Sequence, residues 1–125
     1  MRILLIDDDT QTVEMIRGYL SQLGHLVMTV SDGMAGIQLC NLYQFDLVIC
    51  DLNMPIMNGF DFLDETKAIR VHKGTRIVIL SSETNEIMAL KARQMGAAEF
   101  WVKPPNLYIL GQLLERFSKV YCLEE

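Results

Sequence analysis

Five short apolar runs recur along the chain, and longer segments with helical spacing separate them. Most of the runs are rich in valine, isoleucine and leucine and do not alternate with polar residues. This pattern is typical of parallel strands that are covered on both faces. A chain of 125 residues fits one domain with a hydrophobic core. We predict that this domain contains five strands, at residues 2–6, 25–30, 46–50, 76–80 and 99–102.

The segments between the runs carry the spacing of amphipathic helices. The first has apolar residues three and four positions apart and ends at Gly24. The last segment, 106–121, has a second stripe, made by Leu110, Leu113, Leu114, Phe117 and Tyr121. Three more helices are predicted at 33–43, 59–70 and 84–95, the last of them followed by Gly96. This alternation predicts an α/β fold, a doubly wound five-stranded parallel sheet with right-handed crossovers.

Charge and composition argue against several classes of function. The net charge is −5 and no Lys/Arg cluster is present, which argues against direct nucleic-acid binding. No apolar stretch approaches the roughly 20 residues that cross a bilayer, and the first residues do not read as a signal peptide. The cysteines are odd in number and lack metal-site spacing. We therefore expect reduced, mostly buried thiols in a cytoplasmic protein, at Cys40, Cys50 and Cys122.

All five predicted strands are followed by charged or hydroxyl side chains, and four of the strands are expected to deliver these groups to one site. Open α/β sheets bind their ligands at the carboxyl ends of the strands, so these side chains are expected to converge on one edge. The second strand is instead followed by Ser31 and Asp32, which are typical of a turn and a helix cap. The converging residues are Asp7, Asp8 and Asp9 after the first strand, Asp51 after the third, Ser81 and Ser82 after the fourth, and Lys103 and Pro104 after the fifth.

The chemistry of this edge points to phosphoryl transfer. Asp7, Asp8 and Asp51 are too negative to lie together unless a cation binds or protons are retained. Carboxylates without histidine or thiolate companions suit a hard ion such as Mg²⁺. Lys103 can pair with a carboxylate or a phosphoryl oxygen, and the Ser81 hydroxyl can donate to another phosphoryl oxygen. Together these groups predict transfer of a phosphoryl group onto an aspartate.

Four motifs carry a specific family resemblance. "ILLIDDD", "DLVICDLNMPIMNG", "IVILSS" and "FWVKP" resemble the successive signatures of bacterial response-regulator receiver domains, in order and with matching spacing. The resemblance covers essentially the whole chain, so residues 1–125 are predicted to be one receiver domain. It implies a flavodoxin-like (βα)5 fold with strand order 2-1-3-4-5. It also implies that the chain is not an enzyme in the usual sense, but a phosphoacceptor that takes part in its own phosphotransfer and autodephosphorylation.

The resemblance also implies a role for each matching residue. Asp51 would be the phosphoacceptor, Asp7 and Asp8 the acidic pair that holds Mg²⁺, and the Asn53 backbone carbonyl a further ligand. Ser81 would be the switch hydroxyl, and Lys103 the lysine that holds the phosphoryl group. The remaining implied features are a switch aromatic at Phe100, positions that tune hydrolysis at Asn53 and Glu83, and a cis peptide bond at Lys103–Pro104.

Partners and output follow from the same resemblance. The phosphodonor would be a histidine kinase or a histidine phosphotransfer protein. Drawing Ser81 inward would leave space for Phe100 to turn in, which would repack the face made by the fourth helix, the fifth strand and the fifth helix. A downstream protein, an output domain or a second copy would then read that face. The chain would be either a stand-alone regulator or a receiver cut from a larger one.

Two other function classes stay open on the sequence. One is a receiver-like interaction module that acts without phosphorylation, which the intact set of Asp8, Asp51, Ser81 and Lys103 argues against. The other is a haloacid-dehalogenase-type phosphatase, whose motif the residues around Asp7 and Asp9 do not match. A flavodoxin-like FMN binder is disfavoured, because three aspartates would repel a phosphate group without a metal.

Several other residues have simpler structural interpretations. Asp9 or Thr10 is expected to cap the following helix. His25 and His72 lie at polar turns and are predicted to be solvated, not phosphodonors. Pro105 departs from the family pattern and predicts a stiffer turn after Lys103. The methionines Met54, Met57, Met88 and Met95 are predicted to fill the core and loops.

Overall fold

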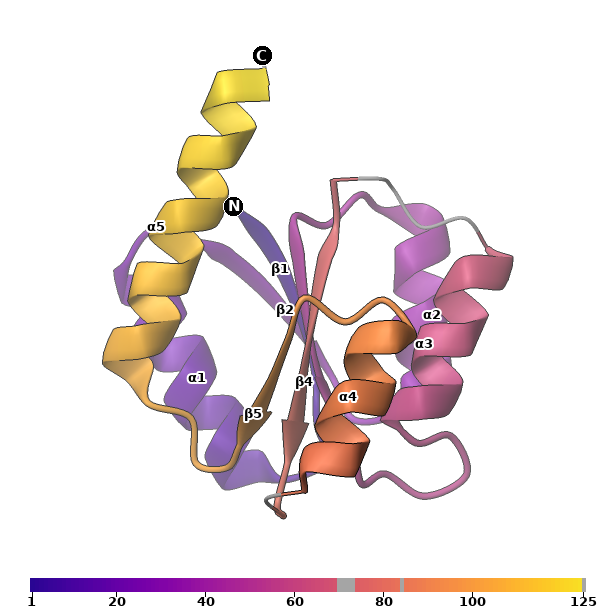
Figure 1. Ribbon diagram of the computed structural model, residues 1–125. Helices are drawn as coiled ribbons and strands as arrows, with labels where there is room; N and C mark the ends of the chain where they lie inside the picture. Colours follow the sequence, from indigo (N-terminus) through magenta and orange to yellow (C-terminus); the bar gives the residue numbers. More distant parts are fainter. Residues whose placement is uncertain (70–73, 84, 125) are drawn as a thin grey trace.

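The computed structural model describes residues 1–69, 74–83 and 85–124, with side chains as far as residue 117. Five strands and five helices alternate along the chain (Figure 1). They are β1 (Arg2–Ile6), α1 (Thr10–Gln22), β2 (Leu26–Val30), α2 (Gly33–Leu42), β3 (Leu47–Asp51), α3 (Gly59–Ala68), β4 (Arg76–Ser81), α4 (Glu86–Gln94), β5 (Glu99–Val102) and α5 (Leu107–Glu124). Predictions on His72, Thr84 and the side chains of Tyr121 and Cys122 lie outside the described part.

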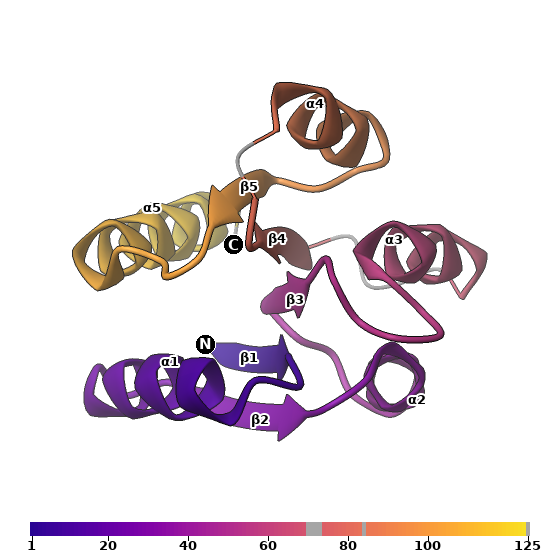
Figure 2. The same cartoon turned by 90° about the horizontal axis from the view of Figure 1, so that it is seen from below.

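All five strands are parallel and form one sheet in the order β2-β1-β3-β4-β5. The predicted fold class and strand order are therefore confirmed, and the described element boundaries differ from the predicted ones by three residues or fewer. Helices α1 and α5 cover one face of the sheet, and α2, α3 and α4 cover the other, as the end-on view shows (Figure 2). No described helix combines the length and the apolar character needed to cross a membrane.

Two apolar cores fill the spaces between the sheet and its helix layers. The α1/α5 side contains Ile16 and Leu20 from α1 and Leu110, Leu113 and Leu114 from α5. The other side holds Phe62, Phe100 and Cys50 among its buried members. The predicted role of the methionines is confirmed, because Met54 is buried in this second core and Met57, Met88 and Met95 pack against it.

Strand β2 does not match the prediction that the strands are covered on both faces. Leu26 is 68% exposed and Met28 is 39% exposed. By contrast, every residue of β3 is buried. The difference follows from the strand order, because β2 lies at an edge of the sheet and β3 lies at its centre.

Side chains at the helix ends support the local structure. Asp9 and Asp32 cap the N-termini of α1 and α2, as predicted, and Asn58 forms a capping box with Asp61 at the start of α3. Gly24 and Gly96 have φ values of +90° and +110° after α1 and α4, a conformation that glycine adopts without steric cost.

The prediction for the described thiols is confirmed, whereas the prediction for the described histidine is wrong. Cys50 is buried and Cys40 half-buried, both as free thiols, and burial raises the pKa of Cys40 to about 11. The prediction of reduced, mostly buried thiols is thus confirmed for these two. His25 is half-buried, not solvated as predicted, and its Nδ1 lies 3.0 Å from the amino nitrogen of Met1. Burial lowers the pKa of His25.

Candidate functional site

The carboxyl ends of β1, β3, β4 and β5 bring the predicted groups to one edge of the sheet. Asp51 is the last residue of β3 and Ser81 the last residue of β4. Asp7 directly follows β1, and Lys103 directly follows β5. Strand pairing fixes these positions, since Leu80 lies beside Asp51 and Val102 beside Ser81.

Three carboxylates form the centre of the site. One oxygen each from Asp7, Asp8 and Asp51 can be chosen so that all three lie within 4.8 Å of one another. Asp7 is 2% exposed and Asp51 3% exposed, whereas Asp8 is open to solvent. Two of the three negative charges are therefore removed from water, which is costly unless positive charge or a proton compensates them.

The Lys103 ammonium supplies positive charge to the two buried carboxylates. Its Nζ lies 2.8 Å from Asp7 Oδ2 and 3.3 Å from Asp51 Oδ2. The Lys103–Pro104 peptide bond is cis, as the family resemblance implied, and the Lys103 backbone N–H donates to the Ser81 carbonyl at 2.7 Å. The lysine thus reaches from the β5 end of the sheet across to β1 and β3.

Burial and charge shift the pKa values of this group. Burial raises the pKa of Asp51 and the neighbouring Asp7 raises it further, against the lowering effects of the Asn53 backbone N–H and of Lys103. Burial would lower the pKa of Lys103, but its contacts with Asp7 and Asp51 outweigh that effect and the pKa is raised. The charged form of Lys103 is therefore favoured here, whereas the charged form of Asp51 is disfavoured.

The donor atoms fit a hard divalent cation. Asp7 Oδ2 is buried, and the Lys103 ammonium lies 2.8 Å from it. The cluster offers carboxylate oxygens without a described imidazole or thiolate ligand. Oxygen donors of this kind are what Mg²⁺ prefers. The residues present therefore fit the predicted metal.

The loop that follows Asp51 is held close to the site by backbone contacts. The Asn53 N–H donates to Asp51 Oδ1 at 3.2 Å. The Gly59 N–H donates to the Leu52 carbonyl at 2.9 Å. A Cβ on Gly59 would lie 2.9 Å from the Leu52 Cα, which no ordinary side chain tolerates. Glycine at this position therefore lets α3 begin directly against the loop.

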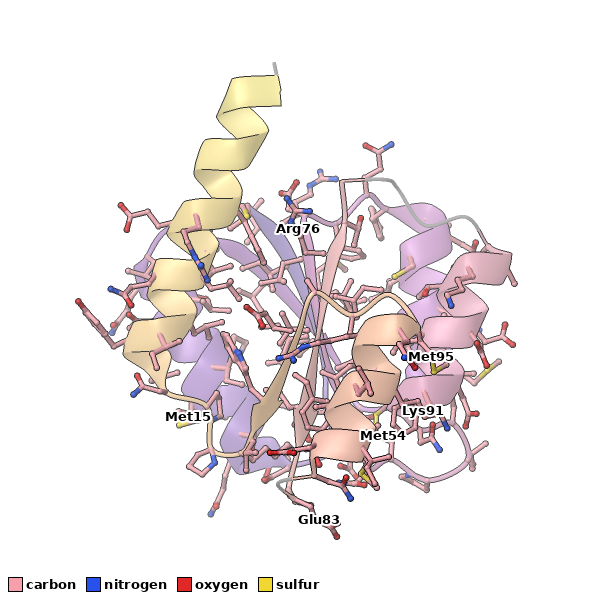
Figure 3. All side chains as sticks on the ribbon, in the orientation of Figure 1. Met15, Met54, Arg76, Glu83, Lys91 and Met95 are labelled. Atoms are coloured by element: carbon pink, nitrogen blue, oxygen red, sulfur yellow. The ribbon has the colours of Figure 1, made fainter. Side chains whose placement is uncertain are left out.

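Ser81 and its neighbours form the opposite wall. Ser81 is fully buried, and its Oγ accepts a hydrogen bond from the Glu83 N–H at 3.1 Å. The Glu83 side chain itself is exposed and points outward (Figure 3). Sequence reasoning missed the role of Ser82, whose Oγ accepts a hydrogen bond from Asn53 Nδ2 at 3.0 Å. This bond joins the loop after β3 to the loop after β4.

Phe100 lies in the core on the α2/α3/α4 side of the sheet. It is 9% exposed and is one of the buried residues of that core. Its turn after Ser81 is drawn toward a phosphoryl group stays a prediction.

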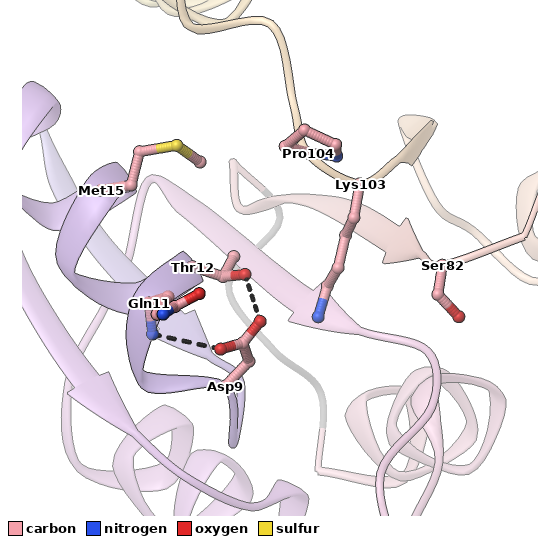
Figure 4. A pocket seen from close by; sticks show the side chains of 7 residues that line it. All are labelled: Asp9, Gln11, Thr12, Met15, Ser82, Lys103 and Pro104. Atoms are coloured by element: carbon pink, nitrogen blue, oxygen red, sulfur yellow. Dashed lines mark hydrogen bonds between the residues drawn. The ribbon is translucent and has the colours of Figure 1, made fainter.

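Asp9 lies beside the site but serves α1. Its carboxylate accepts hydrogen bonds from the Gln11 N–H at 3.1 Å and from Thr12 Oγ1 at 2.8 Å. The Thr12 hydrogen bond lowers the pKa of Asp9. Both bonds are drawn in Figure 4, where Lys103 and Ser82 line the far side of the same hollow of about 430 Å³. The cap prediction for Asp9 is confirmed.

Comparison with protein families gives a match over most of the chain. Residues 3–115 match the family described as response regulator receiver domain. The cell cycle transcriptional regulator CtrA of Caulobacter vibrioides is 36% identical over 104 residues, which cover 83% of this chain and 44% of CtrA. The DNA-binding transcriptional regulator NtrC of Azospirillum brasilense is 35% identical over 114 residues, which cover 91% of this chain and 23% of NtrC. The chain thus spans less than half the length of these relatives.

A solved structure with a similar fold matches nearly the whole length of this chain. The chemotaxis protein CheY4 of Vibrio cholerae has a TM-score of 0.85 and 31% sequence identity, over 93% of this chain and 97% of that chain. The similarity therefore extends over all five strand–helix units.

Proposed function

The chain belongs to the response regulator receiver family, and we propose that its Asp51 carboxylate is the phosphoacceptor. As a receiver domain it is a signalling domain of two-component systems. The observation that carries the proposal is the position of Lys103 Nζ, 3.3 Å from Asp51 Oδ2 and 2.8 Å from Asp7 Oδ2. An ammonium shared by two buried carboxylates can pair with a phosphoryl oxygen as that group arrives.

The transfer step makes one bond and breaks one. An oxygen of Asp51 attacks the phosphorus of a phosphohistidine, the P–N bond breaks, and the imidazole leaves with its electron pair and takes up a proton. Burial and the nearby Asp7 keep the Asp51 carboxylate poorly compensated, as its raised pKa indicates. Lys103 and the Ser81 hydroxyl would hold phosphoryl oxygens after the transfer.

Asp7, Asp8, Asp51 and the Asn53 backbone carbonyl are the groups that would hold Mg²⁺. When bound, the ion would supply positive charge to the phosphoryl oxygens and lessen the repulsion within the cluster. The support for this assignment is the set of three close carboxylates, two of which are buried.

Loss of the phosphoryl group is the second reaction that we propose. Water attacks the phosphorus, the bond to Asp51 breaks, and inorganic phosphate leaves. Asn53 and Glu83 are the proposed tuning residues, because both side chains are exposed beside the site. This autodephosphorylation would make the chain a participant in its own chemistry.

The proposed output is a change in the surface formed by α4, β5 and α5. Apolar side chains are exposed there, including Ile87 at 80% and Leu90 at 57% on α4, and Tyr108 at 70% on α5. A downstream protein, an output domain or a second copy of the chain would bind this surface. The phosphodonor would be a histidine kinase or a histidine phosphotransfer protein. The free thiols of Cys40 and Cys50 are consistent with our proposal of a cytoplasmic location.

Intact-mass measurement with acetyl phosphate tests the proposal. With Mg²⁺ present, the wild-type chain should gain one phosphoryl group, and neither Asp51→Asn nor a sample treated with a chelator should gain it. Asp9→Asn is the matched control, because Asp9 caps α1 and asparagine also caps helices. If the folded wild-type chain gains no phosphoryl group, the alternative of an interaction module that works without phosphorylation replaces the proposal.

A further inference from the structure

A hollow separates α4 from the loop that follows Asp51. It has a volume of about 430 Å³ and is lined by Leu52, Asn53, Met54, Asn58, Phe60 and Met88. Four of these residues, Leu52, Asn53, Met54 and Asn58, belong to the loop between the proposed phosphoacceptor and α3, and Met88 belongs to α4. A change in the conformation of the loop would therefore alter the lining of the hollow that it shares with Met88.

One cation–aromatic contact joins α4 to α3 beside this hollow. Lys91 Nζ of α4 lies 4.4 Å from the centroid of the Phe60 ring, at the start of α3. Lys91 lies on the side of α4 that faces α3 (Figure 3). An ammonium over a ring face at this distance is a favourable contact.

Helix α4 has few other buried anchors. Within Glu86–Gln94, Ala92 is the one buried residue, whereas α3 buries Gly59, Phe62, Leu63 and Thr66. Met88 and Ala89 are partly buried against the core. A helix held by so few apolar contacts has a low free energy of local opening. A single contact such as the Lys91–Phe60 pair, called the tie below, can therefore change its position measurably.

We infer that the Lys91–Phe60 pair holds α4 against α3 in the unphosphorylated chain and that phosphorylation of Asp51 releases it. The inference rests on the proposed function. The loop of Leu52, Asn53 and Met54 transmits the change, because Asn53 contacts Asp51 and all three residues line the same hollow as Phe60 and Met88. Release would change the position of α4 and, with it, that of the exposed apolar residues Ile87 and Leu90 in the proposed output surface.

Hydrogen exchange of the α4 amides tests the tie without any phosphorylation. Lys91→Met keeps the length of the side chain and removes the charge, and Phe60→Leu keeps apolar bulk and removes the ring. Each should raise exchange rates across Glu86–Gln94 by about two- to fivefold, the range that an exposed cation–π pair supplies. Lys91→Arg keeps a cation over the ring and should retain the wild-type rates.

Two comparisons separate the tie from a general loss of helix stability. Lys67→Met removes a basic residue from the last turn of α3, just as Lys91→Met does in α4, and should leave α4 exchange unchanged. The double variant Lys91→Met/Phe60→Leu should match either single variant, because both remove the same contact. Additive effects of the two substitutions, or unchanged exchange in Lys91→Met, would overturn the inference.

A second measurement tests the release. After phosphorylation with acetyl phosphate and Mg²⁺, wild-type α4 exchange should rise toward that of unphosphorylated Lys91→Met. A chain that gains the phosphoryl group and keeps its α4 protection would overturn the inference while leaving the proposed function intact. Absence of the phosphoryl adduct would instead overturn the proposed function and, with it, the release step. The exchange rates of the unphosphorylated variants would still test whether the Lys91–Phe60 pair holds α4.

Discussion

Lys103 Nζ lies nearer to Asp7 Oδ2, at 2.8 Å, than to Asp51 Oδ2, at 3.3 Å. The carboxylate that the lysine compensates best is therefore not the proposed phosphoacceptor. This leaves one oxygen of Asp51 in contact with the Asn53 N–H and the other in a longer ion pair. In the proposed function, this arrangement would leave Asp51 available for reaction while Asp7 pairs with the lysine.

Lys103→Met should destabilise the fold, because it leaves two buried carboxylates without their ammonium partner. Breaking a buried pair of this kind costs about 3 kcal/mol of the free energy of unfolding. The pKa of Lys103 is raised in the folded chain, so its contribution is complete below its ordinary pKa and is lost only as pH rises through the folded value. Urea unfolding at pH 7 in a chelator should show the loss, with Lys67→Met unchanged as the control.

Asp51→Asn should raise the free energy of unfolding at pH 7 by about 1 kcal/mol, since it removes a poorly compensated buried charge. The pKa of Asp51 is raised in the folded chain, by burial first and then by Asp7. A raised acid pKa means that the folded chain binds the proton more tightly, so the cost of Asp51 develops as pH rises from the unfolded to the folded value. The gain in the variant should therefore shrink at pH 3. A gain that is equal at both pH values would contradict the assigned cause.

Mg²⁺ should raise the melting temperature of the wild-type chain, because binding to the folded state alone stabilises it. At a concentration ten times the dissociation constant, the gain is about 1.4 kcal/mol. Asp8→Asn should weaken the response, since Asp8 belongs to the carboxylate cluster, and Asp9→Asn should keep it, since Asp9 caps α1. An equal rise in melting temperature on adding Mg²⁺ in the two variants would contradict the assignment of Asp8, and not Asp9, to the metal site.

Ser82→Ala should shorten the lifetime of the aspartyl phosphate by about two- to fivefold, the range expected for one exposed hydrogen bond. Asn53 Nδ2 donates to Ser82 Oγ at 3.0 Å and ties together the two loops that flank Asp51. Without the tie, water approaches the outer side of the phosphoryl group more easily. Ser82→Thr should restore the lifetime. Loss of the phosphoryl group over time, followed by intact mass, measures it, and an unchanged lifetime in Ser82→Ala would rule the tie out.

The sheet and the strand-end residues could be predicted from local patterns. Uninterrupted apolar runs identify strands, and the carboxyl ends of parallel strands share an edge, which brings Asp7, Asp51, Ser81 and Lys103 together. The exposure of β2 could not be predicted from the run at Leu26–Val30, because an edge strand and a central strand can have similar composition.

The finer contacts of the site depend on tertiary geometry that no local pattern encodes. The Asn53–Ser82 hydrogen bond joins residues 29 positions apart, and neither side chain alone indicates the other. The burial of Phe100 depends on tertiary packing, because it shares its core with residues of other elements, such as Ile79 of β4 and Ala92 of α4. Similarly, nothing in the sequence states that Lys103 lies closer to Asp7 than to Asp51.

Gly59→Ala should cost about 2 to 3 kcal/mol of the free energy of unfolding, as expected when an added atom meets a rigid backbone. The new Cβ would lie 2.9 Å from the Leu52 Cα and 3.3 Å from the Asp51 carbonyl oxygen, so the loop after Asp51 must move. Phosphorylation by acetyl phosphate should slow as well. Gly18→Ala is the matched control, since its Cβ meets nothing within 4 Å inside α1, and it should stabilise the chain by about 0.5 to 1 kcal/mol. Urea unfolding of both variants measures the difference, and equal stabilities would show that the close approach at Gly59 is not required.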